Sequence, residues 1–237
     1  MFNLDLIELP ELQRHDINGV RYYTDTEGTI PEPGYPSVTS VLSADKSKSS
    51  SLESWIQRIG VEAAEAVKHR AASRGTDVHH LLEDYLMGRI TEKKMMPNVI
   101  ELANGLKRIA DERIDNIRLV EGQMFSHHLQ VAGTVDLVAE FDGELAIIDW
   151  KTSSRPKHSK YINNYYMQEA AYAVMFEERT NLPVRKLVTL VAHPEGTQMF
   201  IEDRDKWIGP FKELREEYDR QTSNSRRVAN SDAERVA

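Results

Sequence analysis

The stretch from residue 133 to residue 153 constrains the fold more than any other part of the chain. It reads GTVDLVAEFDGELAIIDWKTS, in which two apolar runs flank Asp142-Gly143. Asp-Gly between two such runs is the strongest short-range signal of a β-hairpin with a two-residue turn. We therefore expect two antiparallel strands, over about residues 129–141 and 144–151.

This turn sets the register of the hairpin and places two acidic residues side by side. If Phe141 faces Glu144, then Asp136 falls directly opposite Asp149. Cross-strand neighbours lie roughly 4.5–5.5 Å apart at Cβ, where two carboxylates destabilise the pair unless a cation lies between them. Lys151 follows Asp149 by two residues and projects from the same face. The hairpin therefore predicts a divalent-cation site beside a lysine.

The ligand types favour Mg²⁺ or Mn²⁺ over Zn²⁺, because carboxylate oxygens suit hard cations. The chain has no cysteine, which excludes disulfides and a cysteine-bound iron–sulfur cluster. Such a site fits phosphodiester hydrolysis, with the ion polarising the phosphate and the lysine orienting a water or offsetting charge. The alternative is a surface hairpin with ordinary salt bridges. Ile147 and Ile148 argue against it, because they predict burial and a buried unpaired Asp is costly.

Four segments in a fixed order resemble one nuclease superfamily. Besides G-x-x-D and D-W-K-T-S in the hairpin, residues 74–79 (RGTDVH) look like a G-x-x-x-H motif and residues 168–172 (QEAAY) like a Q-x-x-x-Y motif. Together they resemble the PD-(D/E)XK superfamily in its RecB-like exonuclease branch, with Val135 in place of the usual proline. Residues 36–42 (PSVTSVL) resemble a segment of the mitochondrial genome maintenance exonucleases and their phage relatives. The resemblance spans about residues 35–180.

The resemblance implies roles for individual residues. Asp136, Asp149 and Lys151 would be catalytic, and the metal ligands would be Asp136, Asp149, His79, the main-chain carbonyl of Trp150 and, as a weaker candidate, Glu121. His79 could instead be an ordinary helix residue, and Glu121 could equally be a surface residue at a strand end. The residues expected to contact DNA are Gln168, Tyr172, Thr39, Ser40, Arg74, Arg155, Lys157 and Lys160. Thr39 and Ser40 could alternatively belong to a helix cap.

The charge pattern is compatible with DNA binding at a local groove. A net charge of −8 argues against nonspecific coating of nucleic acid, but a nuclease needs only a local positive surface. Residues 151–160 supply five basic or histidine side chains without an acid, and residues 58–74 form a second basic segment. A solvated surface is the commoner role of such runs. For residues 151–160 we favour phosphate contact, because they directly follow the candidate catalytic lysine.

The order of predicted elements indicates an α/β fold. Helices come first, one running toward Arg74 and a second from near Thr76 to Met87, then a meander of strands, a helix near 162–180, and further strands near 186–193 and 197–202. We expect a restriction-endonuclease-like core, with a mixed sheet flanked by helices and an N-terminal helical elaboration. The expected organisation is an arm (1–50), a nuclease domain (51–220, helical to 115 and catalytic from 116) and a disordered tail (221–237).

The function predicted from the sequence is a Mg²⁺- or Mn²⁺-dependent DNA exonuclease that acts on single-stranded ends in phage or bacterial DNA processing or recombination. A structure-selective endonuclease on the same core and a catalytically silent DNA-binding module remain alternatives. No apolar run approaches the length of a membrane span, and the N-terminus lacks a basic leader. We therefore expect action in a bacterial or phage-infected cytoplasm. Strand polarity and oligomeric state stay open.

Overall fold

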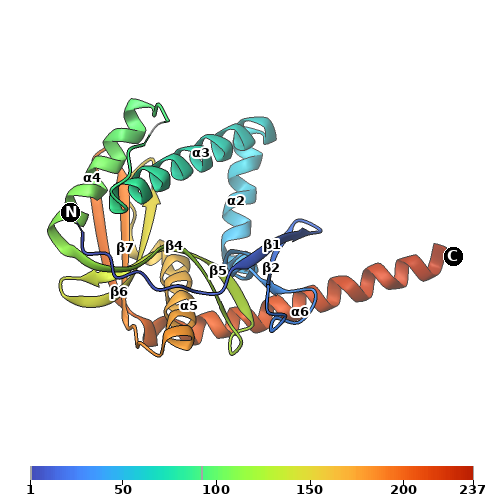
Figure 1. Ribbon diagram of the computed structural model, residues 1–237. Coiled ribbons are helices and arrows are strands. Elements are labelled where there is room, and N and C mark those ends of the chain that lie inside the picture. Colours follow the sequence, from blue (N-terminus) through green and yellow to red (C-terminus); the bar gives the residue numbers. More distant parts are fainter. Residues whose placement is uncertain (1, 92, 237) are drawn as a thin grey trace.

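The computed structural model describes residues 2–91 and 93–236, with side chains described outside 46–52 and 224–236. Its centre is a five-stranded mixed sheet of order β4-β5-β6-β7-β8 (Figure 1). The strands are β4 (Ile114–Ser126), β5 (Val131–Phe141), β6 (Glu144–Thr152), β7 (Lys186–His193) and β8 (Gly196–Asp203). β6 and β7 pair in parallel, and the other neighbours pair antiparallel. The predicted α/β fold with a mixed sheet flanked by helices is confirmed.

The β5–β6 hairpin has the predicted turn and register. Asp142 and Gly143 have φ of 53° and 74°, so both adopt the left-handed backbone that a type I′ turn requires. The ladder runs from Phe141↔Glu144 to Leu137↔Ile148. The next positions along this register are Asp136 and Asp149, and the main-chain N–H of Trp150 donates to Asp136 Oδ2 at 2.9 Å. The local sequence therefore determines how the two acids meet.

Helices cover both faces of the large sheet and bury its apolar side chains. On one face, α3 (Val61–Leu86) and α4 (Pro97–Arg113) pack on Ile148 and Trp150. On the other face, α5 (Asn163–Thr180) and α6 (Arg204–Val236) pack on Ile147. α5 follows the 3₁₀ helix η1 (Ser159–Tyr161) and forms the crossover between the parallel strands β6 and β7.

The N-terminal arm packs against the large sheet. It contains a three-stranded sheet of β1 (Leu12–Ile17), β2 (Val20–Asp25) and β3 (Tyr35–Pro36), followed by α1 (Val38–Leu42). Tyr23, Ile30 and Tyr35 form a small core with Phe125 from β4. Ser37 makes a parallel bridge to Ala132 of β5. The boundary of the nuclease domain at residue 51 stays a prediction, but part of the core lies before it.

The predicted helix boundary between Arg74 and Thr76 is wrong. α3 runs through Gly75 without a break, because a single glycine weakens a helix without ending it. The break lies instead at Gly60, whose φ of 88° separates α2 (Lys46–Ile59) from α3. Figure 1 shows α2 and α3 meeting at a sharp angle, with α3 leading back to the large sheet.

The last helix extends beyond the expected end of the nuclease domain. α6 continues to Val236, whereas the sequence analysis expects a disordered tail from residue 221. Its first half packs on α5 and its end projects away from the sheet (Figure 1). Within residues 2–91 and 93–236, no helix is both long and apolar enough to span a bilayer.

Candidate active site

Three neighbouring strands each place an acidic residue at the same level of the sheet. Asp149 on β6 follows Ile148, which pairs with Leu137 of β5, so Asp149 is level with Asp136. The pairs on either side in the β4–β5 ladder put Glu121 level with Asp136. Glu121 has a φ of 48°, a conformation that L-residues rarely adopt and that redirects its side chain. The three carboxylates converge where α3 reaches the sheet.

His79 from α3 lies next to two of these carboxylates, those of Glu121 and Asp136. Its Nδ1 lies 3.3 Å from Glu121 Oε1 and 3.6 Å from Asp136 Oδ1, and its Nε2 lies 2.9 Å from the carbonyl oxygen of Trp150. Burial lowers the pKa of His79, but the charges of Asp136 and Glu121 outweigh it and raise the pKa to about 9. The imidazole is therefore protonated at neutral pH in this structure, and both of its nitrogens can donate.

Asp149 is the most deeply buried of the three acids. It is 1% exposed, and its Oδ2 forms an ion pair with Lys151 Nζ. Apart from this ion pair, neither oxygen has a hydrogen-bond partner among the described residues. Burial, reinforced by the nearby Asp136, raises the pKa of Asp149 to about 6. A buried carboxylate left in this condition is costly, so the site is suited to an additional cation.

Lys151 carries a positive charge in this arrangement. Burial lowers its pKa, but the charges of Asp149 and Asp136 outweigh that effect and hold the pKa well above its usual range. Its Nζ also lies 5.2 Å from the ring centroid of Tyr165 on α5. An ammonium group held this way can orient a nucleophile or offset negative charge, whereas it cannot accept a proton at neutral pH.

The predicted metal ligands do not all lie in one cluster in the structure. Ligand atoms of His79, Glu121 and Asp136 lie within 4.8 Å of one another, and this is the candidate metal cluster found among the described residues. Asp149 lies outside it, paired with Lys151. The Trp150 carbonyl accepts from His79 and keeps a second lone pair. Carboxylate oxygens with one imidazole fit a hard divalent ion such as Mg²⁺ or Mn²⁺.

The G-x-x-D and Q-x-x-x-Y motifs contact each other through Gly133 and Tyr172. Tyr172 of α5 is 3% exposed, and Gln168 Nε2 donates to its hydroxyl at 3.4 Å. A Cβ on Gly133 would lie 2.9 Å from a carbon of the Tyr172 ring, which is closer than real Cβ contacts. The glycine of G-x-x-D is thus needed for the tyrosine of Q-x-x-x-Y to approach β5. Tyr172 is buried against β5 and Gln168 is partly exposed, and their contact with DNA stays a prediction.

The hydroxyl residues of α1 are engaged in its first turn. Ser37 is the N-cap, and its Oγ accepts from the main-chain N–H of Ser40 at 3.0 Å. The hydroxyls of Thr39 and Ser40 lie 3.0 and 2.8 Å from the same atom. The capping alternative therefore describes their geometry, while Thr39 stays exposed.

The basic residues predicted to contact DNA follow the end of β6. Arg155 and Lys160 are exposed and Lys157 is partly exposed. The backbone of Lys157 is held by the Gln198 amide of β8, with Lys157 N–H donating at 2.6 Å and the carbonyl accepting at 3.0 Å. Arg74 is partly buried on α3, one residue from Gly75, whose position faces Thr152 at the end of β6.

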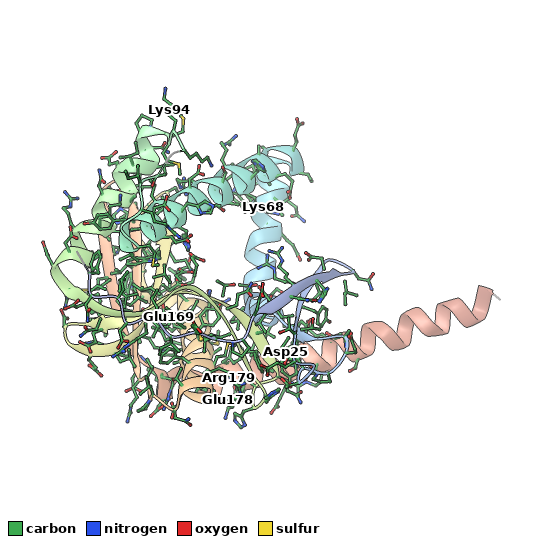
Figure 2. The ribbon with its side chains drawn as sticks, viewed as in Figure 1. Asp25, Lys68, Lys94, Glu169, Glu178 and Arg179 are labelled. Carbon is green, nitrogen blue, oxygen red and sulfur yellow. The ribbon has the colours of Figure 1, made fainter. Side chains whose placement is uncertain are left out.

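Glu169 is a further acidic residue of this region that was not among the predicted site residues. Glu169 lies on α5 (Figure 2) and is fully buried, and the Thr189 hydroxyl donates to its Oε1. Thr189 pairs with Asp149 across β6 and β7. Burial, reinforced by Asp149, raises the pKa of Glu169 well above its usual value, which favours the protonated carboxyl. The available signal was an acidic residue beside Ala170-Ala171 in an apolar part of the helix.

Comparison with known proteins agrees with this geometry. A sequence profile of the PD-(D/E)XK nuclease superfamily matches residues 91–235. Mitochondrial genome maintenance exonuclease 1 of Xenopus tropicalis is 30% identical over 218 residues, which cover 82% of this chain and 60% of the relative. The Homo sapiens protein of the same name is 30% identical over 175 residues, or 68% of this chain and 50% of the relative.

The Mus musculus protein gives nearly the same values, with 30% identity over 68% of this chain and 51% of the relative. The chain thus spans 50 to 60% of the length of the curated relatives it matches. The superfamily profile covers more than half of the chain and includes the hairpin that carries Asp136, Asp149 and Lys151. This chain belongs to the PD-(D/E)XK nuclease superfamily.

Proposed function

We propose that this protein is a divalent-metal-dependent DNA exonuclease that hydrolyses phosphodiester bonds from free single-stranded ends. The observation that carries the proposal is the buried, hydrogen-bond-deficient carboxylate of Asp149 beside Asp136 and Lys151. Burying this carboxylate costs folding stability. Ionisable groups with such perturbed surroundings are concentrated at active sites, which supports a catalytic role for Asp149. The matched relatives are named as exonucleases, which supports the choice of reaction.

The chain's own residues have separable roles in this proposal. His79, Glu121, Asp136 and Asp149 would hold Mg²⁺ or Mn²⁺, with the Trp150 carbonyl orienting the His79 ring through Nε2. When bound, the ion would supply charge to the phosphate and lower the pKa of a water. Lys151 would orient that water and offset charge that develops on the phosphate.

Binding of the metal would change the partners of two cations in this site. His79 is protonated between Glu121 and Asp136, so it must lose a proton from Nδ1 before it can serve as a ligand. Lys151 shares Asp149 Oδ2, so the ammonium stays close to the reacting phosphate. The exposed side chains of Arg155 and Lys160 lie on the segment that follows, where they can contact phosphates of the bound strand.

The proposal for the biological setting is limited to DNA processing. The relatives are animal proteins named for mitochondrial genome maintenance, whereas the sequence analysis expects phage or bacterial DNA processing. DNA processing that needs removal of single-stranded ends is common to both settings. The phage or bacterial origin and the cytoplasmic location stay predictions.

The test is digestion of end-labelled linear and circular single-stranded DNA with Mg²⁺, Mn²⁺ or EDTA. We expect metal-dependent loss of linear DNA, intact circles, and no activity in Lys151→Ala. Lys206→Ala is the matched control. Lys206 is an exposed lysine of α6, and its Nζ lies 2.7 Å from Oε1 of Glu202 on β8. Cutting of circles would identify an endonuclease, and DNA binding without cleavage under every metal condition would contradict the enzyme proposal.

A further inference from the structure

Three tyrosines follow the basic segment after β6, and they have different surroundings. The ring of Tyr165 lies under Lys151 Nζ, at 5.2 Å from its centroid. Tyr166 is 3% exposed and packs on Trp207, with ring centroids 5.0 Å apart. Tyr161 is 67% exposed. Tyr161 is the most exposed of the three, since Tyr165 is partly buried, and a large aromatic surface left in solvent gains nothing from folding.

The exposed ring of Tyr161 stands on a defined piece of backbone. Tyr161 ends the 3₁₀ helix η1, and its N–H donates to the His158 carbonyl at 2.9 Å. The His158 ring meets it edge-on with centroids 6.1 Å apart, and Lys160 Nζ lies 4.9 Å from its centroid. An aromatic face with an ammonium beside it matches a nucleotide, whose base can stack while its phosphate meets the cation.

Both ends of this segment are fixed to the fold. Before it, the Gln198 amide accepts from and donates to the backbone of Lys157, at 2.6 and 3.0 Å. After it, Ile162 is 1% exposed in the protein interior. The ring is therefore held near one position, and binding a ligand there costs less conformational entropy than it would on a mobile loop.

We propose that Tyr161 is a stacking platform for one unpaired base of single-stranded DNA, outside the catalytic centre. The proposal rests on the proposed function and specifies its substrate. The segment leads directly from the strand that carries Lys151, and Arg155, Lys157 and Lys160 provide charge for phosphates. A base within a duplex is already stacked on both faces, whereas an unpaired base has a face for Tyr161.

The test compares Tyr161→Leu with Tyr161→Phe in binding of 2-aminopurine-labelled single-stranded DNA in EDTA, so that no strand is cut. Stacking quenches the 2-aminopurine fluorescence. We expect Tyr161→Phe to behave as wild type and Tyr161→Leu to lose quenching at one label position, with a Kd about 10-fold higher because one base–aromatic stack is lost. Ile90→Ala is the control for an exposed apolar side chain, being 90% exposed on another part of the surface.

Cleavage assays separate this inference from the proposed function. With metal present, Tyr161→Leu should raise KM for single-stranded DNA about 10-fold and leave kcat within about 2-fold, since stacking holds the strand rather than the reacting atoms. Equal quenching and equal KM in Tyr161→Leu and wild type would overturn the platform even if the protein cleaves DNA. A Tyr161-dependent quench in a protein that never cleaves would support the platform and refute the nuclease.

Discussion

Asp25 and Asp149 are both buried aspartates, but they differ in their hydrogen-bond donors and in the direction in which folding shifts their pKa. Asp25, at the end of β2, accepts from Thr29 N–H at 3.0 Å, from its hydroxyl at 2.6 Å and from Ile30 N–H at 2.8 Å. These bonds outweigh the effect of burial and lower its pKa to about 2. Asp149 has an ion pair with Lys151, and burial raises its pKa to about 6.

The difference distinguishes a structural carboxylate from one available to a ligand. All the oxygens of Asp25 have donors from its own loop, so an added cation would compete with existing bonds. Asp149 has only the ion pair between its Oδ2 and Lys151, so its Oδ1 can bind a cation without losing an existing partner among the described residues. Asp25 lies in the small sheet, away from Glu169 and the candidate site (Figure 2). Burial alone therefore does not identify a functional acid. A buried carboxylate that lacks hydrogen-bond donors is the better indicator.

The largest expected effect is on catalysis. Asp149→Asn should lower the rate of DNA cleavage about 10³-fold, because it removes the proposed charged ligand of the metal and the partner of Lys151. Asp25→Asn, the matched change at the satisfied aspartate, should cleave at the wild-type rate. The measurement is the initial rate on end-labelled single-stranded DNA, with circular dichroism to show that both variants fold. A tenth or more of wild-type activity in Asp149→Asn would break the comparison.

The next effect is on stability. Asp25→Asn should lower the free energy of unfolding at pH 7 by about 1–2 kcal/mol, because the hydrogen bonds to Asp25 favour the ionised carboxylate. Since folding lowers the pKa of Asp25, its contribution is present above about pH 4 and is lost as the pH falls toward 2. Urea unfolding of both proteins from pH 7 to pH 3 should show the difference shrinking. A difference in the free energy of unfolding that stays constant with pH would show that it does not come from the ionised carboxylate of Asp25.

The smallest effect concerns Glu169. Below about pH 4.5, Glu169→Gln should change the free energy of unfolding by less than about 0.5 kcal/mol, because a neutral amide replaces a protonated carboxyl of the same shape. Folding raises the pKa of Glu169, so its contribution is present below about pH 4.5 and is lost as the pH rises through the folded-state pKa. The variant should therefore become the more stable protein at alkaline pH.

Glu178→Gln provides a control of opposite sign. Burial raises the pKa of Glu178, but bonds from the Ser126 hydroxyl and the His127 N–H outweigh it and lower the pKa. This variant should lose stability at pH 7 and approach wild type in acid. Parallel pH profiles for the two glutamine variants would show that the two carboxyls are ionised alike.

Local patterns in the sequence predicted the hairpin and part of the site. Asp142-Gly143 determines the register through short-range geometry, so the placement of Asp136 beside Asp149 follows without the rest of the chain. The motif glycine at 133 was recognised, but its contact with Tyr172 depends on how α5 packs on β5. Long-range packing of this kind leaves little trace in a single sequence.

The remaining differences come from backbone conformation and tertiary burial. Glu121 was the weaker candidate, and its positive φ, which no propensity predicts, turns it toward His79 and Asp136. Gly75 suggested a helix boundary, but the packing of Val78 and Leu82 on the sheet maintains one continuous helix. Glu169 was missed because its burial depends on how α5 packs on the sheet, and its partner Thr189 lies 20 residues away in the sequence.

The most direct test of the central claim is a Mn²⁺ titration followed by electron paramagnetic resonance of the free ion at pH 7.5. The unsatisfied carboxylate of Asp149 predicts saturable binding in wild type, binding at least about 10-fold weaker in Asp149→Asn, and unchanged binding in Asp25→Asn. Equal Mn²⁺ affinity in Asp149→Asn and wild type, or no binding in either, would contradict the assignment of Asp149 to a metal site.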